Sequence, residues 1–284
     1  MVNGFYAFAK KTLSENGFDD ANFEARLIAM HAFGVTQNQL LLKTAVCDDE
    51  EKLKNAHDML MRRINHEPLQ YILGTWQFFG LDFSVGKGVL IPRADTEILV
   101  ETALEIIGNK SLKVVDLCSG SGCIAVAINK NTQCDVTAVE LSDDALDYLK
   151  VNCQINNANV KIIKGDVLDE NFAAGFDAVD VIVSNPPYLD YDDMKNLQEE
   201  VKHEPQMALF GGDDGLEYYR QITKIWKKNL DIGGYIIFEV GINQSGDVAK
   251  ILAENGFESI KCVNDLNGIK RVVCAEYKND MKGI

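Results

Sequence analysis

The sequence is poor in proline, with 5 in 284 residues, and its 7 cysteines include no Cys-x-x-Cys pair. Most cysteines lie inside apolar runs, which predicts reduced core residues rather than a disulfide framework. The 4 histidines are scattered, so no metal site is expected. No apolar run approaches the about 20 residues of a membrane span, and no basic segment precedes an apolar stretch at the N-terminus. We therefore expect a cytoplasmic protein.

The chain also lacks a long basic block, and its formal net charge is −15 at pH 7. Nucleic-acid binding depends on Lys and Arg side chains that neutralise phosphates. We therefore expect no direct binding of nucleic acid and no association with a membrane. The content of 46% hydrophobic and 25% charged residues is typical of a globular protein with a buried core.

Residues 1–73 show helical periodicity and no strand pattern. Phe23, Leu27 and Met30 are spaced i, i+4, i+7, which predicts the buried face of one helix. The acidic run 48–51 opens another helix, because carboxylates in a first turn interact favourably with the helix dipole. This region is predicted to be a helical bundle.

From Gly74 onward the pattern changes. The aromatic segment 74–90 predicts a β-hairpin linker. Residues 91–284 alternate between strands and helices, which predicts a parallel sheet covered on both faces. The link before the last strand is too short for a helical crossover, so that strand should run antiparallel. The predicted strands are Lys113–Leu117, Asp135–Glu140, Val160–Lys164, Val181–Ser184, Gly234–Val240, Ser259–Val263 and Arg271–Tyr277. The predicted fold is α/β, Rossmann-like, with a mixed seven-stranded sheet.

The segment KVVDLCSGSGCIAVAI runs from strand through a glycine turn to helix. Gly120 and Gly122 allow a sharp turn and close backbone approach, and the following helix N-terminus offers free N–H groups. Glu140 ends the next strand about 20 residues later, the spacing of a carboxylate that binds ribose hydroxyls. This pattern alone also fits a dinucleotide enzyme.

Asp116 favours a different cofactor. It stands four residues before Gly120, where a carboxylate would repel a pyrophosphate but attract a cationic amino-acid end. S-adenosylmethionine, with its sulfonium and ammonium groups, is such a cofactor. Asp166, after the third strand, is placed to accept a hydrogen bond from an adenine amino group, although an ordinary loop cap is an equal alternative.

The segment VIVSNPPYLD ends a buried strand in Asn185-Pro186-Pro187-Tyr188. Strand termination explains a proline here, but not the Asn and the Tyr. One chemistry that this loop would suit is methylation of a planar –NH2 group. Such a nitrogen is a poor nucleophile, and two hydrogen-bond acceptors would hold the group and shift electron density toward the nitrogen. The Asn185 side-chain oxygen and the Pro186 carbonyl can supply that pair, while the prolines stiffen the loop and the Tyr188 ring can pack on the flat group. Positioning then supplies most of the rate.

NPPY and VVDLCSGSG together resemble amino-methyltransferases that use S-adenosylmethionine. Residues 67–101, 204–220, 236–241 and 267–273 narrow the resemblance to the HemK/PrmC family, over nearly the whole chain. That family methylates the side-chain amide of the glutamine in the Gly-Gly-Gln motif of class I peptide-chain release factors. The resemblance implies a release factor as the protein substrate, and a docking role for residues 1–73.

The resemblance also assigns roles by position. Asn185 and Pro186 would hold the substrate amide, and Pro187 and Tyr188 would complete the pocket. The cofactor's methionine end would be bound by Cys118, Ser119, Gly120, Ser121 and Gly122, and its ribose by Glu140. Asp116, Asp166, Val167 and Asn185 are also predicted to contact the cofactor. The chain departs from the family pattern at Cys118, where the family has glycine, and at Val167, where an aromatic is frequent.

Two residues near this edge have equal alternatives. Arg93 either contacts the cofactor or forms a surface ion pair, and Glu239 either faces the site or pairs with Arg271 or a lysine. The main rival function is N-methylation of an exocyclic amino group on a nucleic-acid base, which needs a basic channel that the sequence does not show. An idle binding scaffold and an NAD-dependent oxidoreductase rank lower. We expect a monomer.

Overall fold

The computed structural model describes residues 1–278, which form two compact units. The first unit consists of residues 1–75 and the short segment 198–203. The second contains residues 76–197 and the chain from 204 onward. Within the described chain, no helix combines the length and the apolar character needed to cross a membrane.

The first unit is helical, as the periodicity predicts. Its helices are α1 (Val2–Glu15), α2 (Ala21–Phe33), α3 (Gln37–Leu41), α4 (Glu50–Ile64) and α5 (Leu69–Leu73). The Asp49 side chain caps α4 by accepting hydrogen bonds from the Glu51 and Lys52 backbone N–H groups. These helices enclose a core of their own, which includes Phe5, Leu13, Ile28 and Leu60.

The prediction of which residues form the buried face of α2 is only partly correct. Leu27 and Met30 pack against the core, but Phe23 is 41% exposed. The fully buried side of α2 consists of Ile28 and two small residues, Ala25 and Ala29. Small residues allow close packing of α2 on its neighbours, and a search for large apolar side chains at helical spacing overlooks them.

Arg63 secures segment 198–203 to the first unit. Its guanidinium is buried, donates to Glu24 Oε2 at 2.6 Å and to Glu200 Oε1 at 2.6 Å, and lies 4.2 Å from the centre of the Phe18 ring. Burial of a charge is tolerated here because two carboxylates and an aromatic face compensate it.

The second unit is built on a seven-stranded mixed sheet, in the order β5-β4-β3-β6-β7-β9-β8. In this order, the strands from β5 to β7 are parallel to one another. Strand β9 is antiparallel to both β7 and β8, as predicted for the last strand. A separate hairpin precedes the sheet, formed by β1 (Thr75–Phe78) and β2 (Leu81–Ser84). The sheet strands are β3 (Lys113–Leu117), β4 (Asp135–Glu140), β5 (Val160–Lys164), β6 (Val179–Ser184), β7 (Leu230–Glu239), β8 (Phe257–Asn264) and β9 (Lys270–Tyr277).

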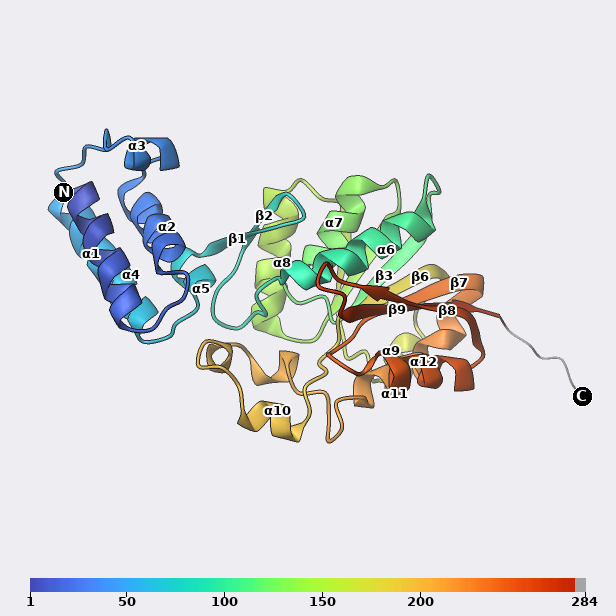
Figure 1. Cartoon of the computed structure of the whole chain (residues 1–284). Helices are drawn as coiled ribbons and strands as arrows, with labels where there is room; N and C mark the ends of the chain where they lie inside the picture. Colours follow the sequence, from blue (N-terminus) through green and yellow to red (C-terminus); the bar gives the residue numbers. More distant parts are fainter. Residues whose placement is uncertain (279–284) are drawn as a thin grey trace, which may run out of the picture. The chain divides into compact units, whose positions relative to one another are not determined.

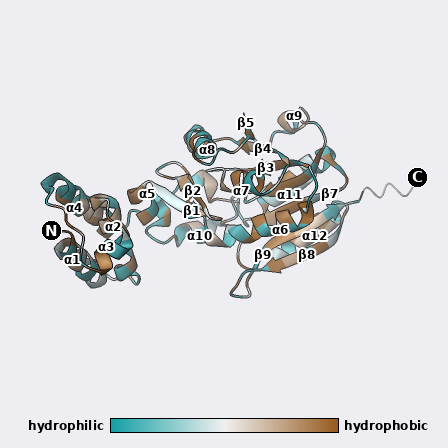
Figure 2. Cartoon of the chain, turned by 90° about the horizontal axis from the view of Figure 1, so that it is seen from above, coloured by the Kyte–Doolittle hydropathy of each residue, from teal (hydrophilic) through white to brown (hydrophobic). Residues whose placement is uncertain are grey.

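Helices cover both faces of this sheet (Figure 1). One face packs against α6 (Glu97–Ile107), α7 (Cys123–Asn131) and α8 (Asp143–Ile155), and the other against α9 (Glu170–Ala173), α11 (Glu217–Trp226) and α12 (Ser245–Glu254). Hydrophobic residues gather in the strands and on the inner sides of these helices (Figure 2). Two separate cores result, as expected for a sheet buried on both faces.

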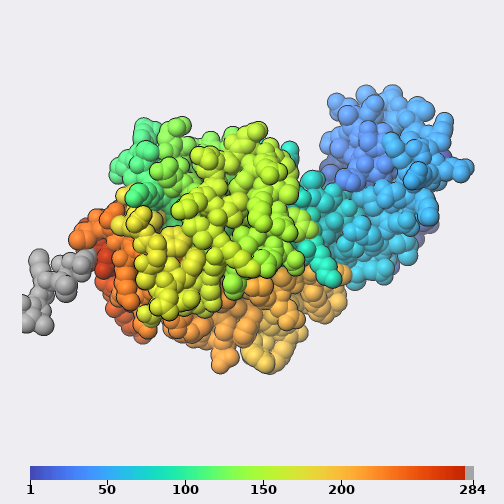
Figure 3. All heavy atoms as spheres, turned by 180° about the vertical axis from the view of Figure 1, so that it is seen from behind, coloured from blue at the N-terminus to red at the C-terminus, as the bar shows by residue number. Residues whose placement is uncertain are grey.

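Short elements fill the connections of the second unit. They are η1 (Ala94–Thr96), α10 (Tyr191–Lys195), η3 (Gln206–Ala208) and η4 (Lys227–Asn229), and η2 (Val201–His203) belongs to the first unit. On the face seen in Figure 3, the yellow-green atoms of the α8 region lie next to the yellow-to-orange atoms of the chain that follows β6. Both segments contribute walls to the cavity described below.

Candidate active site

The glycine turn between β3 and α7 has left-handed backbone at three positions. The φ angles are +60° at Cys118, +53° at Gly120 and +79° at Gly122. A Cβ on Gly122 would lie 2.9 Å from Leu149 Cγ, so the close approach of α8 also requires glycine there. Cys118 adopts a conformation in which glycine is unstrained, which accounts physically for the glycine of the family pattern.

Asp116 lies under this turn. Beside the turn is the cavity that is described below, and Asp116 is not one of the described residues that line it. It is fully buried, its Oδ2 accepts a hydrogen bond from Ala125 N–H at 3.2 Å, and Ser119 Oγ donates to its backbone carbonyl at 2.8 Å. Burial raises the pKa of the Asp116 carboxyl to about 8. In this structure the residue organises the turn from below.

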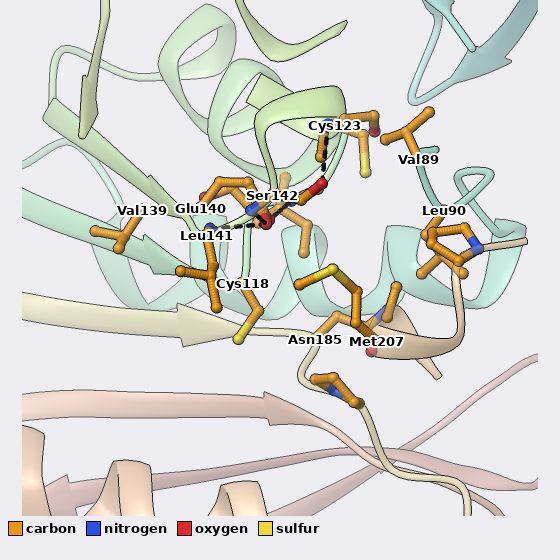
Figure 4. Close-up of a pocket in the computed structure, with 18 of the residues that line it drawn as sticks. Val89, Leu90, Cys118, Cys123, Val139, Glu140, Leu141, Ser142, Asn185 and Met207 are labelled. Atoms are coloured by element: carbon orange, nitrogen blue, oxygen red, sulfur yellow. Dashed lines mark hydrogen bonds between the residues drawn. The ribbon is translucent and has the colours of Figure 1, made fainter. Parts of the chain in front are cut away.

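Glu140 ends β4 beside the turn and lines the cavity. Its Oε2 accepts from Gly120 N–H at 2.7 Å, and its Oε1 accepts from Leu141 and Ser142 N–H, both at 2.8 Å. These three bonds fix the carboxylate without any ligand (Figure 4). A carboxylate held in this way is a preorganised acceptor for hydroxyl groups.

Asp166 and Val167 follow β5 and also line the cavity. Asp166 is exposed, and its Oδ1 accepts from Leu168 N–H at 2.8 Å. Val167 is buried, and its carbonyl accepts from Trp226 Nε1 at 2.8 Å. The indole of the second core therefore fixes the position of the Val167 backbone.

One cavity brings most of the predicted residues together. Cys118, Ser119, Gly120, Ser121, Glu140, Asp166, Val167, Asn185 and Pro187 line it, together with residues of segment 88–93, Thr96, Met207 and Tyr218. Figure 4 shows the sulfur-bearing side chains of Cys118 and Met207 beside Asn185. Of the predicted site residues, Asp116, Gly122, Pro186 and Tyr188 are not among those that line it.

The Asn-Pro-Pro-Tyr loop follows β6 at the carboxyl edge of the sheet. Asn185 is half-buried and donates from Nδ2 to Thr96 Oγ1 at 3.4 Å, and both prolines are buried. The Tyr188 ring lies beside Gly241, where an added Cβ would be 3.1 Å from its Cδ2 atom. Burial raises the pKa of the Tyr188 hydroxyl above its ordinary value, so the hydroxyl stays protonated.

Segment 209–215 supports this loop, and the sequence reasoning assigned it no role of its own. Leu189 N–H donates to Leu209 O at 2.9 Å, and Gly211 N–H donates to Leu189 O at 2.8 Å. A Cβ on Gly211 would lie 2.6 Å from the Pro187 carbonyl oxygen. Segment 204–220 carries part of the family resemblance, and its glycines are the sequence feature that could have revealed this supporting role. Glycine marks places where two backbones approach closely.

Glu204 is a second residue that the sequence reasoning underestimated. It is buried, forms an ion pair with Arg93, and accepts a hydrogen bond from Ile91 N–H at 3.0 Å. Ile91, Arg93 and Pro205 all line the cavity. The sequence left two roles open for Arg93, contact with the cofactor or an ion pair. The structure shows the ion pair, and it lies at the cavity wall.

The chain is similar to known proteins over most of its length. Residues 6–74 match the family model of the PrmC N-terminal domain, and residues 93–212 match that of the methyltransferase small domain. The chain is 44% identical over 232 residues to the release factor glutamine methyltransferase of Clostridium acetobutylicum, covering 80% of this chain and 81% of the relative. It is 39% identical over 263 residues to the enzyme of the same name from Geobacter sulfurreducens, covering 92% of this chain and 91% of the relative.

The fold also resembles solved structures. A methyltransferase from Pyrococcus furiosus superposes with a TM-score of 0.53 at 18% sequence identity, covering 79% of this chain and 99% of that one. At this identity the likeness concerns the fold alone. It places the mixed seven-stranded sheet among methyltransferase folds.

Proposed function

The chain belongs to the family of release factor glutamine methyltransferases, and we propose that the cavity residues carry out its reaction on the glutamine of the Gly-Gly-Gln motif in class I peptide-chain release factors. The observation that carries this proposal is that Asn185 and Pro187 line the same cavity as Gly120 and Glu140. A cofactor held by the glycine turn and an amide held by the Asn-Pro-Pro-Tyr loop would therefore meet.

The residues present fit S-adenosylmethionine. An added Cβ on Gly120 would meet nothing within 4 Å, so the turn presents open backbone to the cavity. We propose that Cys118 to Gly122 hold the methionine end over Asp116, that Glu140 binds the ribose hydroxyls, and that Asp166 and Val167 contact the adenine. When bound, this cofactor supplies a methyl group that its sulfonium makes electrophilic.

The loop supplies the grip on the substrate. We propose that Asn185 Oδ1 and the Pro186 carbonyl accept hydrogen bonds from the two N–H groups of the glutamine amide. Pro187 forms the adjacent wall, and Tyr188 supports the loop from behind. The two acceptors orient the nitrogen and increase its electron density, so its position provides most of the rate.

No protein base is assigned to the reaction. The amide nitrogen becomes acidic only as it gains the methyl group, and its proton can then pass to water. Burial raises the pKa of the Tyr188 hydroxyl, which excludes a tyrosinate as a base near neutral pH. The chemistry therefore depends on orientation rather than on proton abstraction.

The remaining features concern partners. We propose that the helical unit recognises the release factor, since several of its large apolar side chains are exposed: Phe8, Leu41, Leu42, Val46 and Met61. The net charge of −15 supports a protein substrate over a nucleic acid. We further propose that the enzyme acts as a monomer in the cytoplasm.

The decisive experiment measures transfer of labelled methyl groups from S-adenosylmethionine. Three substrates are compared: a purified class I release factor, the same factor with its Gly-Gly-Gln glutamine replaced by alanine, and total RNA or DNA. Label on the intact factor alone is the expected result, and Asn185→Ala should abolish most of it. Label on nucleic acid alone would contradict the proposed substrate while retaining the proposed site chemistry.

A further inference from the structure

Glu239 is a buried carboxylate beside the loop that carries Asn185. It is the last residue of β7, and it is 2% exposed. Strands β6 and β7 are parallel neighbours in which Ser184 pairs with Phe238. The next residues along the two strands are Asn185 and Glu239, so the register brings them together at the carboxyl edge of the sheet.

Among residues 1–278, Glu239 has no ion-pair partner within 4 Å. Arg271, the cation that the sequence offered as a partner, binds Asp95 at 2.9 Å and Asp265 at 3.4 Å instead. In the same part of the chain, Glu239 Oε2 is buried without a hydrogen-bond partner. A buried carboxylate that lacks a cation destabilises the folded state, so packing does not explain an acidic residue here.

The polar neighbours of Glu239 belong to the active site. Burial raises the pKa of the Glu239 carboxyl, and hydrogen bonding from the Thr96 and Asn185 side chains lowers it. Asn185 Nδ2 in turn lies 3.4 Å from Thr96 Oγ1. Thr96 is 2% exposed and lines the same cavity as Asn185. Three side chains, from η1, the loop after β6 and the end of β7, thus lie together at the cavity wall.

A carboxylate only accepts hydrogen bonds, whereas a side-chain amide has one end that donates and one that accepts. A carboxylate beside Asn185 can hold only its –NH2 end, which also donates to Thr96 Oγ1, and this leaves Oδ1 for the cavity. We propose that Glu239, with Thr96, is a positioning residue that fixes the Asn185 amide with Oδ1 toward the substrate glutamine. This inference rests on the proposed function, because it requires that the substrate amide donates to Asn185 Oδ1.

The orientation depends on the charge of Glu239. Burial raises the pKa of its carboxyl to about 7, hydrogen bonding from Thr96 lowers it, and the charge of Asp95 raises it. A protonated Glu239 can donate to Asn185 Oδ1, so the amide is no longer held in one orientation. The other titratable or charged groups that face it are Arg271 of β9, Tyr188 of the loop, Tyr219 of α11 and Cys123 of α7. Burial raises the pKa of the last three, which stay neutral near pH 7.

Glu239→Gln tests the proposal because it keeps the size of the side chain but offers both a donor and an acceptor. The expected result is a fall of about 10- to 100-fold in kcat for release factor methylation. Affinity for S-adenosylmethionine, measured by calorimetry, should remain unchanged. The wild-type rate should fall as the pH drops below about 7, where Glu239 becomes protonated, and the variant should lose that dependence.

Thr96→Val is the second variant, and it should lower kcat in the same direction. Its matched control is Thr223→Val, because Thr223 is equally buried on α11 and its hydroxyl has no partner among the described residues. The control should alter stability alone. Wild-type kcat in both Glu239→Gln and Thr96→Val, or an unchanged pH profile in Glu239→Gln, would overturn the proposal. Absence of release factor labelling by the wild-type enzyme would instead overturn the proposed function.

Discussion

Gln244 holds the backbone of Tyr188 in place: its Nε2 donates to the Tyr188 carbonyl oxygen at 2.8 Å, and its Oε1 accepts from Gly241 N–H at 3.0 Å. One side-chain amide thus connects the loop after β6 to the turn after β7. Both of its polar ends are engaged, so its orientation is defined. The loop that we propose to hold the substrate is therefore anchored to the turn after β7 by two hydrogen bonds.

Gln244→Ala should loosen this loop. We expect kcat/KM for the release factor to fall about tenfold and the free energy of unfolding to fall by about 1–2 kcal/mol, because two hydrogen bonds are lost. Affinity for S-adenosylmethionine should stay unchanged. Gln221→Ala is the matched control, since Gln221 bonds only to exposed Glu217 on its own helix among the described residues. Equal kinetics for the two variants would contradict the role of Gln244.

Gly211→Ala should damage the same loop from the opposite side. The added Cβ would lie 2.6 Å from both the Pro187 carbonyl oxygen and Tyr188 Cα, which are backbone atoms that cannot move aside cheaply. We expect a loss of stability of about 1–3 kcal/mol from overpacking and a large loss of kcat, measured by denaturant unfolding and labelled methyl transfer.

Gly246→Ala provides the control for that substitution. Gly246 lies in α12, and a Cβ there would meet nothing within 4 Å. Alanine should be neutral or stabilise by up to about 1 kcal/mol, because it favours the helix. If Gly211→Ala behaved like Gly246→Ala, the close packing of the loop against segment 209–215 would have no functional importance.

Much of the fold was predictable because its signals are local. Strands β3, β4 and β5 have the predicted bounds, since apolar runs between glycine and polar segments define them. Strand β7 begins at Leu230, earlier than the predicted Gly234, because its first residues pair with β6 across an irregular register. Such pairing depends on the neighbouring strand and leaves no pattern in the sequence of β7 itself.

The candidate site shows the same division. Gly120, Glu140 and Asn185 lie at or just after the carboxyl ends of parallel strands, so their approach to one edge of the sheet follows from topology. Thr96 lines the cavity and Gln244 bonds to the Tyr188 backbone, and the sequence assigned a role to neither residue. Their roles depend on hydrogen bonds between residues as far apart as Asn185 and Thr96, and a single sequence carries no signal for such pairs.

Glu204→Gln should weaken cofactor binding. Glu204 joins Arg93 and the Ile91 backbone, both on the wall of the cavity, and the amide replaces a charged acceptor by a neutral one. We expect the Kd for S-adenosylmethionine to rise about tenfold, because bonds to charged groups are the stronger ones. Glu199→Gln, on an exposed pair with Lys202, is the control. An unchanged Kd in Glu204→Gln would show that the wall keeps its shape without this ion pair.

Asp116→Asn should alter how stability depends on pH. Burial raises the pKa of Asp116 from 3.8 to about 8 in the folded chain. Between these values the unfolded chain loses the proton that the folded chain keeps, so this group's contribution to stability falls as the pH rises. The asparagine variant has no such group, and it should become more stable relative to wild type from pH 6 to pH 9.

Denaturant unfolding of the cofactor-free protein measures this difference, with exposed Asp231→Asn as the reference for effects common to any lost carboxylate. A difference that stays constant with pH would show that Asp116 is ionised in the folded chain, and the cation-attracting role predicted for it would then apply at neutral pH.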